Sequence, residues 1–372
     1  MPDNVPLLEP LTTRELAILE RLAQGRSDQE IADELFLSPN TVRWHNRQIY
    51  GKLGVSSRMQ AIVQAQALGI LPPAGGSPSV SVRPYAPSAH PALQQTVHFT
   101  TSFDGTRIAY AKSGHGPPLV NVATFMSHLE YDRESPVWRH WLEELSREHT
   151  LIRYDERGNG LSDWDVADVS FETWVRDLEA VVDAAGLQTF SLFANSQAGT
   201  VAVAYAVRHP ERVKRMVLHG AYARGWLHRD LTDQQREEEK LLIDLMRVGW
   251  GRQNPAFRQV FAMQLRPDAT LEELKAFDEQ MLISTSTENA ARLESEMHRT
   301  DVRALAPLVS APTLVIHSRG DAGVPFEEGR LLASMIPGAQ FVALESNNHL
   351  LTEHEPAWGK FVSALRTFLA DD

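Results

Sequence analysis

The stretch Thr189-Phe-Ser-Leu-Phe-Ala-Asn-Ser-Gln-Ala-Gly-Thr-Val-Ala-Val-Ala-Tyr-Ala206 decides the fold of the second part of this chain. An apolar, strand-like run ends at Ala194, and a helix-like run begins at Ala198, with Ser196 between them. Small residues two positions before and after a serine permit a sharp, strained strand-to-helix turn that lifts the hydroxyl out of the sheet and places the backbone N–H of Gln197 beside it. A small-residue turn without any chemistry has the same spacing, so other residues must decide between the two interpretations.

Length and composition favour two globular domains without membrane spans. The chain has 372 residues, of which 43% are hydrophobic and 23% charged, values typical of soluble protein. The absence of cysteine excludes disulfides, thiolate metal sites and cysteine nucleophiles. No apolar run is long enough to cross a membrane, and the start of the chain lacks a secretory signal. We therefore expect a cytoplasmic protein with no membrane association, no cofactor and no metal.

Charge is unevenly distributed along the chain. The net charge of −12 argues against a polyanionic partner for the protein as a whole. Between Phe36 and Ile70, however, there is no Asp or Glu, and this segment holds four basic side chains: Arg43, Arg47, Lys52 and Arg58. Any contact with a nucleic acid is therefore expected in this segment.

Residues 1–70 have the signals of a small all-α domain with four helices. Capping boxes at 12–15 and 27–30 start the first two helices, and Pro39 opens a third that ends near residue 53. A fourth helix is expected over about 57–68. Two short helices joined by a tight turn, the second with a basic outer face, predict a helix-turn-helix that binds double-stranded DNA. A helical interaction domain with a solvated basic face is the alternative.

The same segment resembles the LuxR-type DNA-binding domain along nearly its whole length. The matching stretches are Leu11-Thr-Thr-Arg-Glu-Leu, Ile31-Ala-Asp-Glu-Leu, Leu37-Ser-Pro-Asn-Thr-Val-Arg-Trp-His and Ile49-Tyr-Gly-Lys-Leu-Gly-Val-Ser-Ser-Arg. The resemblance implies a homodimer formed through the fourth helix, with backbone contact by Lys52. It also implies DNA contacts by residues of the third helix: Asn40, Thr41, Arg43, Trp44 and Arg47. In this chain the domain comes first, whereas such domains more often come last.

A linker and a second domain follow. Residues 71–94 are rich in Pro, Gly, Ser and Ala and lack an apolar period, which is typical of a linker. From 95 to 372, strand and helix patterns alternate, which predicts a mostly parallel sheet covered by helices. The segment of about 222–305 has helical patterns only, and its position suggests an inserted cap over the strand ends. We expect four apolar side chains to line a ligand pocket there: Phe125, Met246, Trp250 and Met281.

Two further residues are candidates to act together with Ser196 in catalysis. Asp321 follows the strand expected at 313–318, and His349 follows the strand expected at 340–344. A serine, an acid and a histidine at three strand ends, in this chain order, are the elements of a hydrolytic triad. In such a triad His349 takes the proton of Ser196, and Asp321 holds the imidazole tautomer.

Residues 95–372 resemble the α/β-hydrolase superfamily. The matching stretches are Asp155-Glu-Arg-Gly-Asn-Gly-Leu-Ser, the turn at Ser196, Gly320-Asp-Ala-Gly-Val-Pro and Asn348-His349. The resemblance implies that the backbone N–H groups of Phe125 and Gln197 form the oxyanion hole. Two departures are Ala123-Thr124 where the family often has His-Gly, and alanines instead of glycines around the serine.

Two functions fit these expectations. The first is a transcription regulator whose hydrolase-fold domain senses a small, mostly apolar ligand, with slow turnover as a variant of the same hypothesis. The second is an active carboxylesterase or lactonase with an autoregulatory DNA-binding module. Ester turnover that disappears in Ser196→Ala supports the enzyme. A promoter response that survives in the same variant shows that turnover is not the signal.

Overall fold

A computed structural model describes residues 11–23, 26–35, 39–53, 55, 58–68, 70–71, 93–252 and 254–370. The chain divides into two compact units, Met1–Ser88 and Ala89–Asp372. In the described part no helix is long and apolar enough to cross a lipid bilayer.

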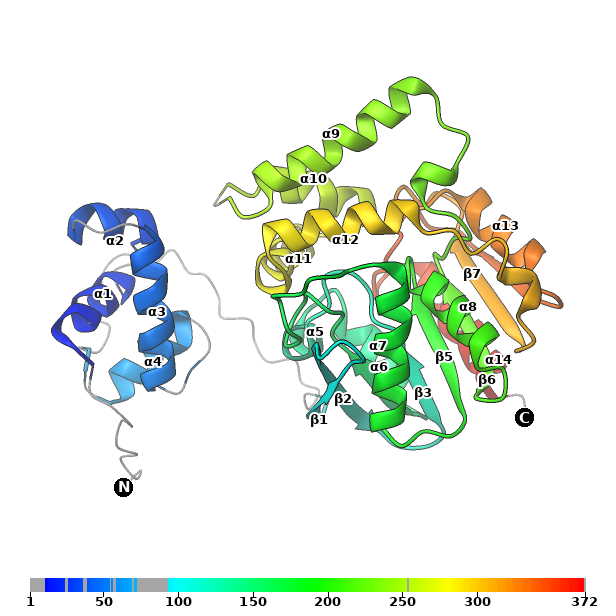
Figure 1. The fold of residues 1–372 in the computed structure, drawn as a ribbon, viewed down its shortest axis with the longest axis horizontal. Helices are drawn as coiled ribbons and strands as arrows, with labels where there is room; N and C mark the ends of the chain where they lie inside the picture. The colour runs from blue at the N-terminus through cyan, green and yellow to red at the C-terminus, as the bar shows by residue number, and fades with distance from the viewer. Residues whose placement is uncertain are drawn as a thin grey trace. The chain divides into compact units, whose positions relative to one another are not determined.

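The first unit is a bundle of four helices (Figure 1): α1 (Thr13–Ala23), α2 (Asp28–Leu35), α3 (Pro39–Leu53) and α4 (Arg58–Ala67). Both expected capping boxes are formed, because Thr12 N donates to Glu15 Oε2 at 2.7 Å and Ser27 N donates to Glu30 Oε2 at 2.7 Å. Apolar side chains from all four helices meet in one buried core: Ile18, Leu19, Leu22, Ile31, Ala32, Val42, Ile49, Leu53, Ala61, Ala65 and Leu71. The predicted all-α helix-turn-helix architecture is therefore confirmed.

The second unit is built on an eight-stranded sheet with the order β1-β2-β4-β3-β5-β6-β7-β8. The strands are β1 (Gln95–Thr101), β2 (Arg107–Gly114), β3 (Pro118–Asn121), β4 (Thr150–Tyr154), β5 (Phe190–Asn195), β6 (Val213–His219), β7 (Thr313–Ser318) and β8 (Gln340–Leu344). β1 and β2 form an antiparallel hairpin, β2 runs antiparallel to β4, and the remaining neighbours are parallel. The mostly parallel sheet predicted from the alternating pattern is thus present.

Helices cover both faces of this sheet. They are α5 (Leu129–Glu134), α6 (Arg139–Ser146), α7 (Phe171–Ala184), α8 (Ala198–Arg208), α13 (Phe326–Met335) and α14 (Pro356–Ala370). In Figure 1, α7 and α8 lie in front of the sheet and α14 lies behind it. On the rear face Trp141 of α6 packs against Phe361 of α14, with ring centroids 4.8 Å apart. Buried side chains on both sides give the long apolar strands the environment that their composition requires.

The segment between β6 and β7 forms a helical cap. Its helices are the short turn η1 (Trp226–His228), α9 (Asp233–Gly249), α10 (Ala256–Leu265), α11 (Leu271–Ser284) and α12 (Thr287–Arg299), and the turn η2 (Ala306–Leu308) leads back to the sheet. Figure 1 shows the cap helices above the carboxyl ends of the strands. The expected helical insertion is therefore found where open parallel sheets bind ligands.

Candidate active site

Ser196 lies at the apex of a tight turn between β5 and α8. Its φ angle of 54° is in the left-handed region, which costs a non-glycine residue about 1–2 kcal/mol. The flanking Ala194 and Ala198 are fully buried, so larger side chains would have no room there. Ser196 N donates to the carbonyl oxygen of His219 at 2.9 Å, which holds the turn against β6. The strained strand-to-helix turn expected from the sequence is present.

Asp321 and His349 form a buried pair. Nδ1 of His349 lies 2.7 Å from Oδ2 of Asp321, and Oδ1 of Asp321 accepts backbone N–H bonds from Gly323 at 2.9 Å and Val324 at 2.8 Å. Burial acts to raise the pKa of Asp321, but His349 and these hydrogen bonds outweigh it, so the pKa lies below its usual value. An ionised Asp321 can therefore fix the orientation of the imidazole and stabilise its protonated form.

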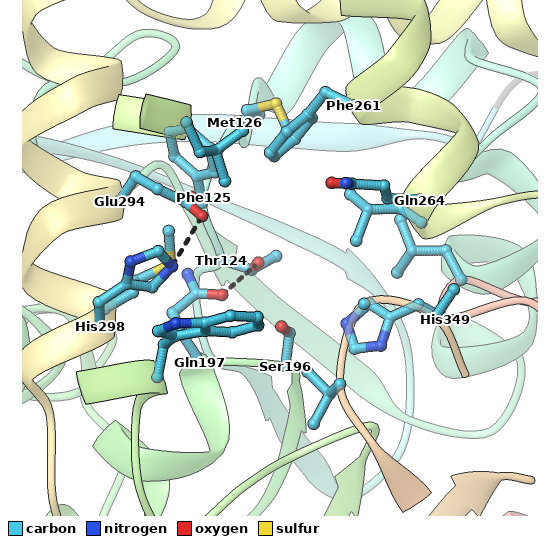
Figure 2. A pocket seen from close by; sticks show the side chains of 18 of the residues that line it. Thr124, Phe125, Met126, Ser196, Gln197, Phe261, Gln264, Glu294, His298 and His349 are labelled. Atoms are coloured by element: carbon cyan, nitrogen blue, oxygen red, sulfur yellow. Dashed lines mark hydrogen bonds and ion pairs between the residues drawn. The ribbon is translucent and has the colours of Figure 1, made fainter. Parts of the chain in front are cut away.

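Ser196 and His349 share one cavity of about 480 Å³. Figure 2 shows the serine hydroxyl and the imidazole on adjoining parts of its wall, below the cap residues. No hydrogen bond joins these two side chains in the described part of the chain. The structure thus brings all three expected side chains together, with the serine and the histidine open to a ligand and the aspartate behind the histidine.

The two residues expected to stabilise an oxyanion also face this cavity. Phe125 lies on the loop after β3, and Gln197 directly follows Ser196. The side-chain oxygen Oε1 of Gln197 accepts a hydrogen bond from the Thr124 hydroxyl at 3.0 Å, which ties the loop to the start of α8 (Figure 2). In the described residues the non-glycine positions with positive φ are Ser196 and Met126, the latter at 66°. The backbone at Thr124, where the family often has glycine, therefore does not require a positive φ.

Gln280 of the cap holds the loop that carries Phe125. Its Nε2 atom donates to the carbonyl oxygen of Met126 at 3.0 Å and to Oδ1 of Asp132 at 3.0 Å. Its Oε1 atom accepts from the indole N–H of Trp138 at 3.1 Å. The side chain is buried and fully bonded, so it fixes the cap to the expected oxyanion loop. Sequence reasoning missed Gln280, because a single amide on an amphipathic helix has no distinguishing pattern.

The cavity wall is mostly apolar. Its residues are Thr124, Phe125, Met126, Trp138, Ser196, Gln197, Tyr222, Trp226, Arg229, Glu238, Leu241, Leu242, Leu245, Phe261, Gln264, Leu265, Phe277, Gln280, Glu294, Met297, His298, Ala322, Gly323, Val324, His349 and Leu350. Nε2 of His298 lies 3.2 Å from Oε1 of Glu294, one turn away on α12, and both side chains line the wall (Figure 2). The i, i+4 spacing of an acid and a histidine on one helix is the sequence signal for this contact.

The prediction that four apolar side chains line the pocket is wrong for three of them. Phe125 lines the cavity, whereas Met246, Trp250 and Met281 are absent from its described wall and are buried in the cap core. The indole N–H of Trp250 donates to the carbonyl oxygen of Met281 at 3.1 Å, and its ring lies 5.6 Å from that of Phe125. These side chains support the wall from behind, because each cap helix has an apolar face toward its neighbours as well as toward the cavity.

The residues expected to contact DNA belong to the first unit. Asn40, Thr41, Arg43, Trp44 and Arg47 are positions of α3, and their side chains lie outside the described part of the structure. Lys52 is described, and its ammonium group lies 2.9 Å from Oε2 of Glu15 on α1. Lys52 thus joins α3 to α1 inside the domain, and its contact with a DNA backbone stays a prediction.

Two known families match the two units of this chain. Residues 117–356 match the family described as alpha/beta hydrolase fold, which covers more than half of the chain. The chain belongs to the α/β-hydrolase family. Residues 9–65 match the bacterial regulatory proteins of the luxR family, so this hydrolase-fold protein has a LuxR-type domain at its N-terminal side. The expected fusion of the two families is confirmed.

Several enzymes are similar to the hydrolase unit. A pyrrolizixenacetamide deacetylase from Xenorhabdus hominickii is 26% identical over 270 residues, which is 72% of this chain and 96% of the relative. A 2-hydroxymuconate semialdehyde hydrolase from Pseudomonas putida is 30% identical, over 53% of this chain and 68% of the relative. An esterase from Exiguobacterium antarcticum has the same fold, with a TM-score of 0.63 and 22% identity over 73% of this chain and 99% of its own.

Proposed function

We propose that this protein is a DNA-binding regulator whose hydrolase-fold unit binds a small, mostly apolar ligand and can hydrolyse ester or lactone bonds slowly. The observation that carries the proposal is the cavity of about 480 Å³ against which both Ser196 and His349 lie, with Asp321 2.7 Å behind the imidazole. The LuxR-type domain supplies the DNA-binding half. A ligand-binding unit joined to this domain would regulate its binding to DNA.

The arrangement supports a two-step acyl transfer. Nε2 of His349 would accept the proton of the Ser196 hydroxyl as its oxygen attacks the ligand carbonyl. The backbone N–H groups of Phe125 and Gln197 would stabilise the negative charge on the carbonyl oxygen. The protonated imidazole then returns its proton to the leaving alcohol, and a water molecule, activated by the same histidine, releases the acid and regenerates the serine.

Binding alone would be sufficient for signalling. The cap supplies most of the cavity wall, so a ligand that fills the cavity would favour the closed cap over any open arrangement. In a homodimer this shift would change the spacing of the two DNA-binding domains. Turnover would then end the signal by destroying the ligand.

The Ser196→Ala variant of the full-length protein tests the proposal. We expect wild-type protein to release p-nitrophenol from p-nitrophenyl butyrate and the variant to lose this activity. We expect the variant to retain binding of apolar probes and its response on DNA, because removal of one hydroxyl leaves the cavity intact. Loss of the DNA response together with turnover would instead support catalysis as the signal. A wild-type protein that neither binds apolar probes nor hydrolyses the ester would contradict the proposal.

The second candidate is a carboxylesterase or lactonase with an autoregulatory DNA-binding module. The pairing of His349 with an ionised Asp321 favours it, because a cavity used only for binding does not need an oriented imidazole. A high turnover of p-nitrophenyl esters, together with DNA binding that does not change on addition of any substrate or product, would favour this candidate.

A further inference from the structure

The cap places one cation against the cavity without a hydrogen-bond partner. Arg229 follows η1 and lines the cavity, and its guanidinium donates no hydrogen bond within the described residues. Its guanidinium carbon lies 5.6 Å from the ring centre of Trp226 and 5.8 Å from that of Tyr222. Cation–π contact with two aromatic rings holds the fork in place, but its buried Nε–H has no hydrogen-bond partner in the described residues, although buried polar groups are normally hydrogen-bonded.

The carboxylate beside Arg229 pairs more closely with another arginine. Nε of Arg229 lies 3.9 Å from Oε1 of Glu328, a distance too long for a hydrogen bond. Arg224 contacts the same carboxylate at 3.3 Å and also lies 3.6 Å from Asp230, which is fully exposed. Two guanidinium groups therefore share one buried carboxylate, Arg224 at the shorter distance, and the second carboxylate nearby, that of Asp230, is in solvent.

The two carboxylates on the described wall have partners of their own. Glu294 is engaged by His298 at 3.2 Å, and Glu238 is exposed and accepts from Gln234 at 2.8 Å. Burial lowers the pKa of Arg229, against the opposing effects of Glu328, Tyr222 and Asp321. Burial, together with the neighbouring Arg224, outweighs these opposing effects on the pKa.

We propose that Arg229 binds an anionic group of the ligand, a carboxylate in particular, and so makes the cavity selective for amphipathic acids. The planar fork of an arginine matches the two oxygens of a carboxylate, and the apolar wall formed by side chains such as Leu242 and Phe261 suits the ligand's hydrocarbon part. This inference rests on the proposed ligand-binding function and narrows it. The ligand would be an aryl or acyl compound with a carboxylate at one end.

Calorimetric binding to the full-length protein tests this selectivity. The probes are 4-phenylbutanoate and 6-phenylhexanoate, each compared with the uncharged amide of the same length. We expect the acids to bind wild-type protein at least about tenfold more tightly than the amides, as a charge-assisted pair typically provides. Arg229→Gln should abolish this preference, and Arg229→Lys should retain part of it because the charge remains while the fork is lost.

A matched control separates a local from a general effect of charge. Arg247 is also a cap arginine, but it pairs with Asp244 at 3.3 Å and does not belong to the described cavity wall. Arg247→Gln should leave the preference unchanged. Tryptophan fluorescence of each variant verifies that the fold is retained, and Arg229→Lys serves as the test if Arg229→Gln unfolds.

The outcomes distinguish this inference from the proposed function. Acids and amides that bind wild-type protein equally, acids that do not bind at all, a preference that survives in Arg229→Gln, or one that is undiminished in Arg229→Lys would overturn the inference. Because the probes contain no ester, the result does not depend on turnover. A wild-type protein that shows the preference but hydrolyses no ester would remove the catalytic part of the proposed function and leave the role of Arg229 standing.

Discussion

Gly220 makes room for the imidazole of His349. A Cβ atom at position 220 would lie 2.8 Å from Cε1 of the ring, closer than such atoms approach in proteins, and a tight 3.1 Å from Nδ1. Gly220 directly follows β6, and its φ angle is +58°. The absence of a side chain at this strand end is thus a condition for the pairing of His349 with Asp321.

Gly220→Ala should displace His349 and reduce ester hydrolysis at least about 100-fold, since a misplacement near 1 Å can have this effect. The measurement is kcat/KM with p-nitrophenyl butyrate. Gly338→Ala is the matched control, because Gly338 also has a positive φ of +69° but an alanine methyl group there would meet nothing within 4 Å beyond its chain neighbours. Both variants should lose about 1–2 kcal/mol of stability from backbone strain. Equal activities of the two would contradict the steric role of Gly220.

Gln280→Leu should impair both stability and turnover. The variant removes the Gln280 partner of the Met126 carbonyl, of Oδ1 of Asp132 and of the Trp138 indole N–H, at about 1–3 kcal/mol for each buried group. Release of the Phe125 loop should lower kcat toward the roughly 100-fold loss seen when one oxyanion donor is removed. Gln259→Leu is the control, because Gln259 belongs to the cap helix α10 but not to the described cavity wall. A Gln280→Leu protein with normal kcat would show that the loop holds its position without the cap.

The contrast between Ser196 and Gln280 shows what the sequence could predict. The turn at Ser196 depends on neighbours in the chain, Ala194 and Ala198, so its conformation is encoded locally. The role of Gln280 depends on Met126, which is 154 positions away, and on the path of a loop with positive φ. No periodic pattern predicts such a contact, and the same holds for Arg229.

The sheet and the cap show the same contrast between local features, which the sequence predicts, and long-range contacts, which it does not. Apolar runs and turn signals predicted the individual strands, because burial and turn chemistry are local properties. The insertion of β4 between β2 and β3 follows from pairing across the sheet and was not predictable from spacing. For Met246, Trp250 and Met281, an apolar helical stripe indicated burial correctly but could not distinguish the cap core from the cavity wall.

Buried histidines should make the hydrolase unit sensitive to acid. Burial lowers the pKa of His140 to about 3, although its Nε2 atom lies 3.0 Å from the carbonyl oxygen of Leu351. Between pH 6.5 and 3 the unfolded chain binds a proton at this position and the folded chain does not. The free energy of unfolding should therefore fall as the pH is lowered through this range, by about 1.4 kcal/mol per pH unit for this group.

His140→Gln tests this effect, since glutamine keeps a donor for the Leu351 carbonyl but does not titrate. Denaturant unfolding followed by tryptophan fluorescence should show a pH slope smaller by one proton between about pH 6 and pH 4. Of the eight tryptophans, Trp44 alone precedes residue 93, so the signal comes mainly from the hydrolase unit. The difference at about pH 8, where both chains carry a neutral side chain, measures lost packing alone. An unchanged slope would show that His140 is protonated in the folded state.

Arg43→Ala should weaken DNA binding without affecting the hydrolase unit. Arg43 belongs to α3, the helix expected in the major groove, and loss of one base-reading arginine costs about 1–3 kcal/mol. The measurement is a gel shift of full-length protein on fragments that the wild type selects from a random-sequence library. The Kd should rise about tenfold or more, and the affinity for 4-phenylbutanoate should stay the same.

Arg26→Ala provides the control for total charge. Arg26 lies between α1 and α2 and pairs with Glu34 at 3.3 Å, so its removal subtracts the same charge from the domain without changing α3. If α3 reads bases in the groove, Arg43→Ala should lose more DNA affinity than Arg26→Ala. The Arg43→Ala variant should also select a wider range of sequences. Equal losses in the two variants would mean that the domain attracts DNA through its overall charge, and the assignment of α3 to the groove would fail.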